Sequence, residues 1–231
     1  MHLRASVALI DIEGTVGSIA FVRDVLFPYA SQRMDGYVRA HRNEPQMRAL
    51  LDAAARELHC DANDLPAILA GLHAWAERDE KVTVLKELQG LIWAEGFTSS
   101  GIRGHLFDDA VAALHRFFAA GARLYVYSSG SIAAQRLLFG YSTAGDLLSL
   151  FSGFYDTATG GKSDAASYVS IARDVGTQPA QIVFFSDNER ELDAAANAGI
   201  QTVQLARPED GTVRSDRHLA VPSFDGIDVL P

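Results

Sequence analysis

Short apolar runs alternate with segments of helical periodicity through most of this chain, and this alternation narrows the possible folds more than any other property of the sequence. The apolar runs read as buried strands, because each is short and is followed by polar or glycine residues. They lie at residues 6–10, 123–127, 182–185 and 202–205. Segments of helical spacing at 131–141, 163–175 and 189–198 separate the last three runs. Parallel strands need crossover connections of this kind, so we predict an α/β fold with a doubly wound parallel sheet.

Residues 17–105 break this alternation, because they contain helical patterns and no convincing strand. Apolar residues repeat at helical spacing from Ile19 as far as Pro28, which we expect to kink or end that helix. Further helices are expected at 45–59, 65–76, 83–93 and 108–120. The chain therefore divides into an α/β core, residues 1–16 and 106–231, and an inserted helical unit, residues 17–105.

The position of this insert suggests a role for it. It begins directly after the first strand, at the carboxyl edge of the sheet, and open α/β sheets bind their ligands at that edge. We expect the insert to be a cap over the edge. The alternative is an additional packing layer remote from any site.

Composition excludes several classes of partner. The chain has 231 residues with 29 acidic and 20 basic side chains, a formal charge of -9, which repels nucleic acid and anionic lipid. No stretch approaches the ~18 uncharged apolar residues of a membrane span. Cys60 is the single cysteine, so no internal disulfide can form, and we expect a cytoplasmic protein. Residues 207–231 contain proline and glycine and are expected to be surface loop.

Two acidic residues follow the first strand, in the segment Asp11-Ile12-Glu13-Gly14-Thr15. Side chains alternate along an extended chain, so we expect the carboxylates of Asp11 and Glu13 on the same face. Carboxylates this close repel each other, which raises the pKa of at least one of them unless a cation lies between them. A solvated turn with helix-capping acids would explain the same residues.

Polar residues also follow two later segments. Ser128 and Ser129 come after the second strand and before a helix, where hydroxyls and backbone N–H groups can bind an anion such as phosphate. An ordinary serine N-cap is the alternative there. Lys162 lies beside two glycines before another helix, and its charge could neutralise a phosphate or a group of carboxylates.

Asp187 follows the strand at 182–185, and we expect it at the position equivalent to Asp11 on a neighbouring strand. Two acids on adjacent strand ends form an oxygen site that suits Mg²⁺ better than Zn²⁺. The four polar clusters thus fall at one edge of one sheet and supply complementary groups. Their combination predicts a site that acts on a phosphate ester.

The order of these motifs resembles that of the haloacid dehalogenase-like hydrolases, whose Asp-x-Asp-x-Thr, Ser/Thr, Lys and acidic motifs match residues 11–15, Ser128, Lys162 and Asp187. The second acid is Glu13 rather than aspartate, and Asp-Ile-Glu-Gly-Thr is similar to the enolase-phosphatases of methionine salvage. Other stretches that resemble those enzymes are residues 21–30, 85–93, 125–135 and 137–141.

The resemblance implies two activities on 2,3-diketo-5-methylthiopentyl 1-phosphate, namely enolisation and then hydrolysis of the phosphate to give the acireductone 1,2-dihydroxy-3-keto-5-methylthiopentene. It implies that Asp11 forms an aspartyl-phosphate and that Glu13 acts first as acid and then as base. Ser128, Ser129 and Lys162 would bind the phosphoryl oxygens. One Mg²⁺ per monomer would be held by the carboxylates of Asp11 and Asp187 and the carbonyl of Glu13. No residue identifies itself as the base for enolisation.

Two other functions fit parts of the pattern. A plain phosphomonoesterase or phosphomutase on the same scaffold would differ only in not enolising its substrate before phosphate leaves. A non-catalytic, receiver-like domain also combines acids, a hydroxyl and a lysine, but the helical insert and Glu13 disfavour it. We expect a monomer whose partner is the small phosphorylated diketone, with no nucleic acid and no membrane.

Overall fold

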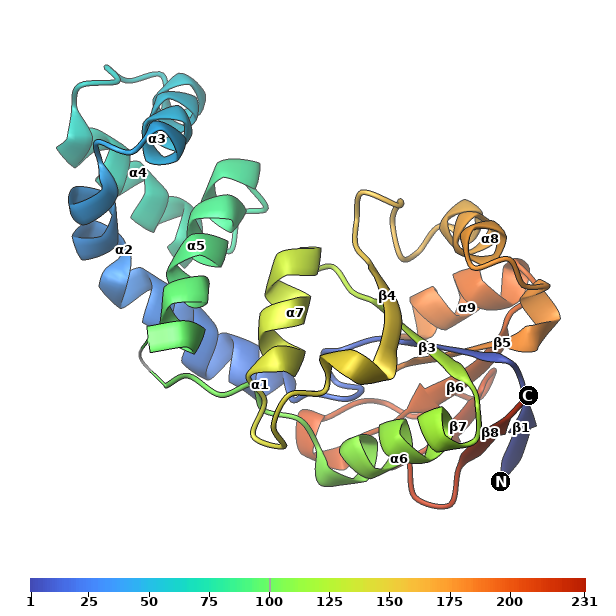
Figure 1. Cartoon of the computed structure of the whole chain (residues 1–231). Coiled ribbons are helices and arrows are strands. Elements are labelled where there is room, and N and C mark those ends of the chain that lie inside the picture. Colours follow the sequence, from blue (N-terminus) through green and yellow to red (C-terminus); the bar gives the residue numbers. More distant parts are fainter. Residues whose placement is uncertain (100) are drawn as a thin grey trace. The chain divides into compact units, whose positions relative to one another are not determined.

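A six-stranded parallel sheet organises the larger part of the chain, as the sequence predicts (Figure 1). The strand order is β4-β3-β2-β5-β6-β7, and every neighbouring pair is parallel. The strands are β2 (Val7–Ile10), β3 (Arg123–Tyr127), β4 (Phe151–Tyr155), β5 (Ile182–Ser186), β6 (Gln201–Leu205) and β7 (Leu219–Val221). A separate parallel pair joins β1 (His2–Arg4) to β8 (Asp228–Leu230).

The chain divides into two units in this computed structural model, which describes residues 1–99 and 101–231. Unit 1 comprises Met1–Phe21 and Arg103–Pro231 and contains the sheet. Unit 2 comprises Val22–Ile102 and is helical. None of the helices in the described part of the chain is both long and apolar enough to cross a membrane.

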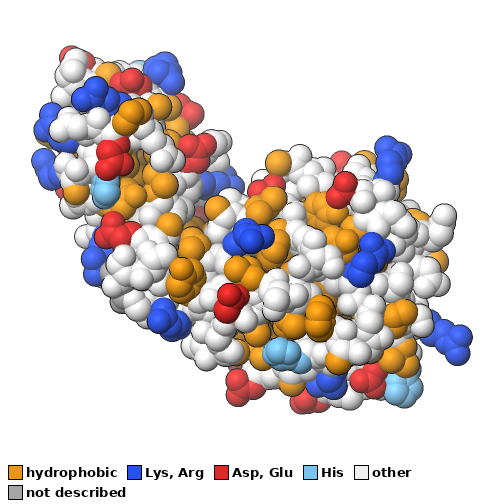
Figure 2. Space-filling view, in the orientation of Figure 1, with side chains coloured by type: hydrophobic (Ala, Val, Ile, Leu, Met, Phe, Trp, Pro, Cys, Tyr) orange, Lys and Arg blue, Asp and Glu red, His pale blue; other side chains and the backbone are white. Residues whose placement is uncertain are grey.

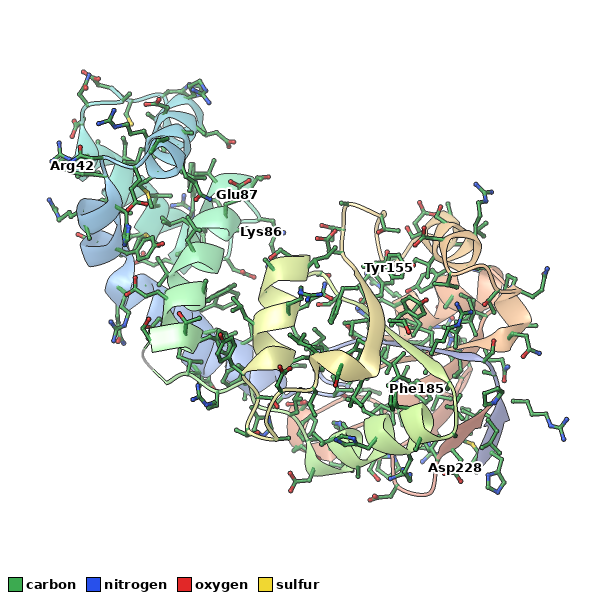
Figure 3. All side chains as sticks on the ribbon, in the orientation of Figure 1. Arg42, Lys86, Glu87, Tyr155, Phe185 and Asp228 are labelled. Atoms are coloured by element: carbon green, nitrogen blue, oxygen red, sulfur yellow. The ribbon has the colours of Figure 1, made fainter. Side chains whose placement is uncertain are left out.

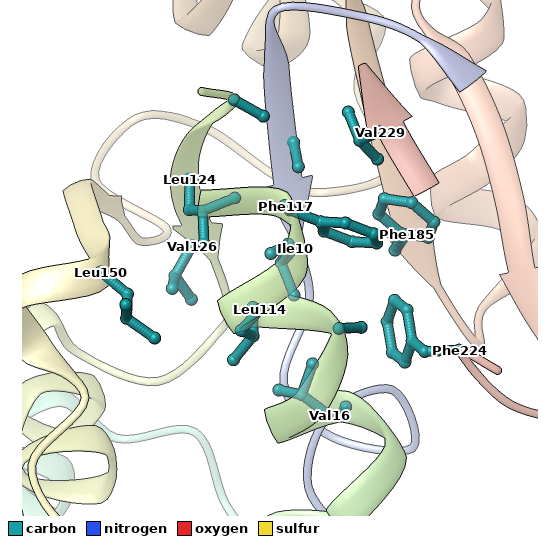
Figure 4. Packing of buried hydrophobic residues seen from close by; sticks show 14 of the residues in the cluster. Ile10, Val16, Leu114, Phe117, Leu124, Val126, Leu150, Phe185, Phe224 and Val229 are labelled. Atoms are coloured by element: carbon teal, nitrogen blue, oxygen red, sulfur yellow. The ribbon is translucent and has the colours of Figure 1, made fainter. Parts of the chain in front are cut away.

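Both faces of the sheet in unit 1 are buried, which is why its central strands are apolar throughout. Along β2, Ala8 and Ile10 join one hydrophobic cluster while Val7 and Leu9 join another. The first cluster includes α6 (Asp108–Ala119), whose Phe117 ring stacks 5.8 Å from that of Phe185 on β5 (Figures 3 and 4). The second cluster includes α8 (Ala165–Asp174) and α9 (Glu189–Asn197). The sheet is therefore covered by helices on both sides, and α7 (Ile132–Gly140) follows β3.

Unit 2 has a hydrophobic core of its own. Its helices are α2 (Phe27–His41), α3 (Pro45–Leu58), α4 (Leu65–Glu77) and α5 (Thr83–Ser99), preceded by a π-helical turn, Val22–Leu26, and by the short α1 (Ile19–Phe21) of unit 1. Pro28 does not end the helix, although the helical run passes through the π-helical turn Val22–Leu26 just before it. Pro28 lies in the first turn of α2, where a helix does not use the backbone N–H, and the helix continues to His41.

Two further expectations are corrected in unit 1. The strand β4, with the sequence Phe-Ser-Gly-Phe-Tyr, was not predicted, because it is only partly buried and has no continuous apolar run. Residues 207–231 are not simply surface loop. They contain β7 and β8, and the side chains of Arg207, Phe224 and Val229 are buried.

Charged side chains are dispersed over the visible surface. Figure 2 shows lysine and arginine side chains scattered among acidic and uncharged ones on the visible face of each unit. Together with the net charge of -9, this dispersal leaves that face without the basic stripe that a phosphate backbone requires.

Candidate active site

Four strand ends bring the residues singled out in the sequence to one edge of the sheet. β2 lies between β3 and β5, and β4 lies on the far side of β3. Asp11 follows β2, Ser128 follows β3 and Asp187 follows β5, while Lys162 lies in the loop after β4. Because the strands are parallel, these residues all leave the sheet at its carboxyl edge, the edge at which α/β sheets bind ligands.

Strand register corrects the position predicted for Asp187. Ile10 pairs with Phe185, and the N–H of Asp11 donates to the carbonyl of Phe185 at 2.9 Å. The residue level with Asp11 is therefore Ser186, and Asp187 lies one residue farther along. Ser186 is fully buried, and its Oγ lies 3.2 Å from Oδ2 of Asp11.

Lys162 is the centre of a buried ionic cluster. Its Nζ lies 2.5 Å from Oδ1 of Asp11 and 2.6 Å from Oε2 of Glu191, and all three side chains are almost fully buried. Burial alone would lower the pKa of the lysine, but the charges of the two carboxylates outweigh it and raise that pKa above its usual range. The lysine is therefore held as a cation beside Asp11.

Glu191 is a member of this cluster that the sequence analysis did not single out. It lies in the first turn of α9, and its Oε2 is 3.0 Å from Oγ of Ser186. Burial, followed by the charge of Asp11, raises the pKa of Glu191, although Lys162 opposes this shift. The signal in the sequence is its position four residues after Asp187, one helical turn behind the strand end.

Asp187 is packed against the turn that follows Asp11. Gly14 has a φ of +69°, and a Cβ at that position would lie 2.5 Å from Oδ2 of Asp187, so both the backbone and the space require glycine. The N–H of Asp187 donates to Oγ1 of Thr15 at 3.0 Å. Burial, then the charges of Asp11 and Glu191, raise the pKa of Asp187 to about 7. The turn after β2 is thus packed against the end of β5 and hydrogen-bonded to it.

Glu13 lies in a tight turn and not in an extension of the strand. β2 ends at Ile10, and the carbonyl of Ile12 accepts N–H groups from residues 15, 16 and 17. The alternation on which we expected Asp11 and Glu13 to share a face therefore does not extend to Glu13. Its side chain is exposed, whereas Asp11 is 4% exposed.

The two serines of the loop after β3 differ in their exposure to solvent. Ser128 is buried, and its Oγ accepts from the N–H of Gly130 at 3.2 Å, while Ser129 is exposed. The helix N-cap is Ser131, whose Oγ accepts from the N–H of Ala134. The two candidate serines thus precede the residue that caps α7.

A buried glutamine holds this loop against the next strand. Nε2 of Gln135 donates to the carbonyl of Gly130 at 2.7 Å and to the carbonyl of Tyr155 at 2.9 Å, at the end of β4 (Figure 3). The N–H of Ser128 donates to the same Tyr155 carbonyl at 3.2 Å. The serine loop is therefore fixed relative to the strand that leads to Lys162.

The sequence is similar to those of known proteins over nearly its whole length. The family model of the haloacid dehalogenase-like hydrolases matches residues 6–199. A protein named Enolase-phosphatase E1 from Pseudomonas fluorescens is 46% identical over 222 residues, which cover 96% of each chain. Its namesake from Gluconacetobacter diazotrophicus is 48% identical over 219 residues, covering 95% of this chain and 91% of that one. The chain belongs to the enolase-phosphatases of the haloacid dehalogenase-like hydrolase family.

A solved structure agrees with this assignment of fold. The UTR4 protein of Saccharomyces cerevisiae superimposes with a TM-score of 0.82 at 33% identity, covering 96% of this chain and 100% of that one. The predicted α/β fold and the family resemblance are both confirmed.

In this hydrolase, three hydroxyl groups hold the loop that carries Lys162. Tyr127 donates to the carbonyl of Gly160 at 2.9 Å, Ser167 to that of Gly161 at 2.9 Å, and Tyr168 to that of Lys162 itself at 2.7 Å. Three successive carbonyls are thus bound by side chains of β3 and α8. Sequence reasoning missed these residues, because hydroxyls in apolar segments look like ordinary core positions.

Replacing Tyr168 with phenylalanine should therefore destabilise unit 1 of this hydrolase. Both the hydroxyl and the Lys162 carbonyl are buried, and an orphaned buried carbonyl costs roughly 1–3 kcal/mol. Urea unfolding followed by circular dichroism measures the loss. Tyr29→Phe is the control, because the Tyr29 hydroxyl is buried without a hydrogen-bond partner among the described residues, and its removal should cost nothing. Equal stability of the two variants would contradict the role of Tyr168.

Proposed function

We infer that the protein is an enolase-phosphatase that converts 2,3-diketo-5-methylthiopentyl 1-phosphate into the acireductone 1,2-dihydroxy-3-keto-5-methylthiopentene and phosphate, a step of methionine salvage. Similarity to enolase-phosphatases over about 95% of the chain supports the substrate and the two activities. The observation that carries the phosphatase half is the buried carboxylate of Asp11 at the end of the central strand, paired at 2.5 Å with Lys162.

Asp11 is the proposed nucleophile. One of its carboxylate oxygens bonds to phosphorus while the bond from phosphorus to the ester oxygen breaks, which gives an aspartyl-phosphate. Lys162 keeps the carboxylate in one position and, as a cation, offsets negative charge that gathers at the phosphoryl group. Ser186, close to the other carboxylate oxygen, further limits rotation of the side chain.

Glu13 is the proposed acid and base. It donates a proton to the ester oxygen as that oxygen leaves, and its carboxylate then takes a proton from the water that attacks the aspartyl-phosphate. This second step releases phosphate and restores Asp11. The exposure of the Glu13 side chain supports the assignment, since a group that serves both steps must meet substrate and water.

Ser128, Ser129 and Lys162 are proposed to bind the phosphoryl oxygens. The two serines lie just before the N-terminus of α7, where N–H groups and hydroxyls favour an anion. Lys162 reaches the same edge from the loop after β4.

A single Mg²⁺ is proposed at the carboxylates of Asp11 and Asp187 and the main-chain carbonyl of Glu13. Lys162 pairs with Asp11 and Glu191, and Asp187 adds a third acid nearby. Burial, then the charges of Asp11 and Glu191, raise the pKa of Asp187, which supports a further cation at this place. Mg²⁺ usually binds through one or two carboxylates together with water and a substrate phosphate, which suits this donor set. Among the described residues no group of three His, Cys, Asp or Glu side chains is arranged as a metal site. When bound, the ion would neutralise negative charge where the phosphate enters.

Unit 2 is proposed to be a cap that contributes to the choice of substrate. It is inserted between Phe21 and Arg103 of unit 1, in the segment that follows Asp11 and Glu13. We also propose a monomer, since the proposed catalytic, phosphate-binding and metal-binding residues all belong to unit 1 and the site needs no residue from a second copy. The single cysteine, Cys60, is a free thiol, as suits a cytoplasmic enzyme.

The order of the two reactions tests this function. On rapid mixing with the diketone phosphate, we expect the absorbance of an enol-phosphate to appear no later than free phosphate, and an oxygen-sensitive acireductone to be the final product. If phosphate appears first and the dephosphorylated diketone accumulates, the protein is a plain phosphatase on this scaffold.

A further inference from the structure

Arg207 is buried more completely than any other charged side chain of the described chain, at 2% exposure. It follows β6, in the segment that sequence analysis treats as surface loop. Burying a guanidinium costs free energy unless its N–H groups find hydrogen-bond acceptors and its charge is paired. The partners of Arg207 therefore indicate its role.

Its hydrogen bonds go to a carboxylate and to the carbonyl of Thr15, and Nη1 lies 3.9 Å from Oε1 of the more exposed Glu209. Nη2 of Arg207 donates to Oδ2 of Asp109 at 2.9 Å, and Nε donates to the carbonyl of Thr15 at 2.8 Å. The guanidinium carbon lies 3.9 Å from the centre of the Phe107 ring, which covers one face of the group. Asp109 is itself fixed, because Oδ2 also accepts from the N–H of Phe224 at 2.7 Å.

Thr15 connects this arginine to the site. Its Oγ1 accepts from the N–H of Asp187 at 3.0 Å, and its own N–H donates to the carbonyl of Ile12 at 3.1 Å. Thr15 is therefore held from three directions, by the turn that contains Glu13, by the end of β5 and by Arg207. A second bond from the same segment, Oγ of Ser18 to Oδ1 of Asp210 at 3.0 Å, fixes the end of the turn.

We propose that Arg207 is a positioning residue for phosphoryl transfer, an inference that rests on the proposed function. By holding the carbonyl of Thr15, it keeps the turn after β2 in the place where Glu13 and Asp11 act together with Asp187. It touches neither the substrate nor the reacting atoms. Displacement of a catalytic group by about 1 Å can cost ~100-fold in rate, so a bond to the turn controls activity without binding substrate.

Arginine suits this position better than lysine does. Its planar group donates in fixed directions, and it uses different nitrogens for Thr15 and Asp109. A lysine can neutralise Asp109 but lacks the second fixed donor. The two substitutions of Arg207 therefore separate charge balance from positioning.

The experiment compares four variants in the full chain with an aryl phosphate and saturating Mg²⁺. Arg207→Lys should stay folded but lose about 10-fold to 100-fold in kcat, with KM within about 2-fold, because Lys162 and the serines are held by β3, β4 and α8. Arg207→Met should lose kcat and stability together. Adding Asp109→Asn to Arg207→Met removes the unpaired acid and should recover stability but not kcat. Arg214→Met, an exposed arginine of the same segment, is the control and should resemble the wild type.

Two results would overturn the proposal. One is a normal kcat in Arg207→Lys, and the other is recovery of kcat together with stability in the double variant, which would make Arg207 only structural. Circular dichroism reports the folded state, and fluorescence of Trp75 and Trp93, both in unit 2, shows whether that unit is unchanged. A wild type that releases no phosphate would instead contradict the proposed function itself. Should Arg207→Met fail to fold, Arg207→Lys and the double variant still decide the question.

Discussion

Asp11→Asn should lower phosphate release by roughly 10⁴-fold or more, as expected for removal of a nucleophile. Asparagine has nearly the same volume as aspartate and keeps one carbonyl oxygen, but it cannot form the aspartyl-phosphate. Phosphate release from the diketone phosphate and from an aryl phosphate measures the loss. The rate should fall by a similar factor with both substrates, because both require attack by Asp11.

Three observations complete this test. Circular dichroism should show a folded protein, because Lys162 still pairs with Glu191. Asp216→Asn, at an exposed aspartate of unit 1, should release phosphate at the wild-type rate. Phosphate release by Asp11→Asn within about 10-fold of the wild type would rule out the aspartyl-phosphate.

Removal of divalent metal should also silence the enzyme, with a loss of about 10³-fold that added Mg²⁺ reverses, since a bound ion supplies several kcal/mol of charge stabilisation. The physical reason is the acid cluster, in which Lys162 cannot balance Asp11, Asp187 and Glu191 as well as an incoming phosphate. Phosphate release after exhaustive chelation, followed by titration with Mg²⁺, measures the effect. Full activity of the chelated protein would contradict the metal site.

Asp187→Asn tests whether Asp187 is one of the carboxylates that bind Mg²⁺. This variant should need much more Mg²⁺ for half-maximal activity, because asparagine supplies only a neutral oxygen. Asp193→Asn, in the helix α9 that follows Asp187, is the matched control. Asp193 pairs with Arg217 and His218, and its loss should leave the Mg²⁺ dependence unchanged.

The sequence predicted the parts of the fold that depend on local pattern. β2 and β5 are almost entirely apolar because helices cover both faces of the sheet, and such runs stand out in a sequence. β4 has serine and glycine in place of a continuous apolar run, so its pairing with β3 is fixed by tertiary contact and left no local signal.

The candidate site was predictable where a residue directly follows a strand. Asp11, Ser128 and Asp187 could be placed at one edge by topology alone. Glu191 and Arg207 could not, because their roles depend on partners far away in the chain, at Lys162 and Thr15. Burial of a charged side chain is a property of the folded state, and the chain gives no local pattern for it.

The placement of β2 has a consequence for how this protein folds. Val7 pairs with Arg123 on one side and with Ile182 on the other. The central strand of the sheet can therefore pair only with segments that lie more than a hundred residues later in the chain. Closing so long a loop is slow, and a folded unit 2 would shorten it. The segments of unit 1 on either side of unit 2 are joined by a hydrogen bond of 2.9 Å from the N–H of Phe107 to the carbonyl of Val16. The strand that leads to the proposed nucleophile, Asp11, would then be among the last to be enclosed, and we expect partly folded chains to have no phosphatase activity.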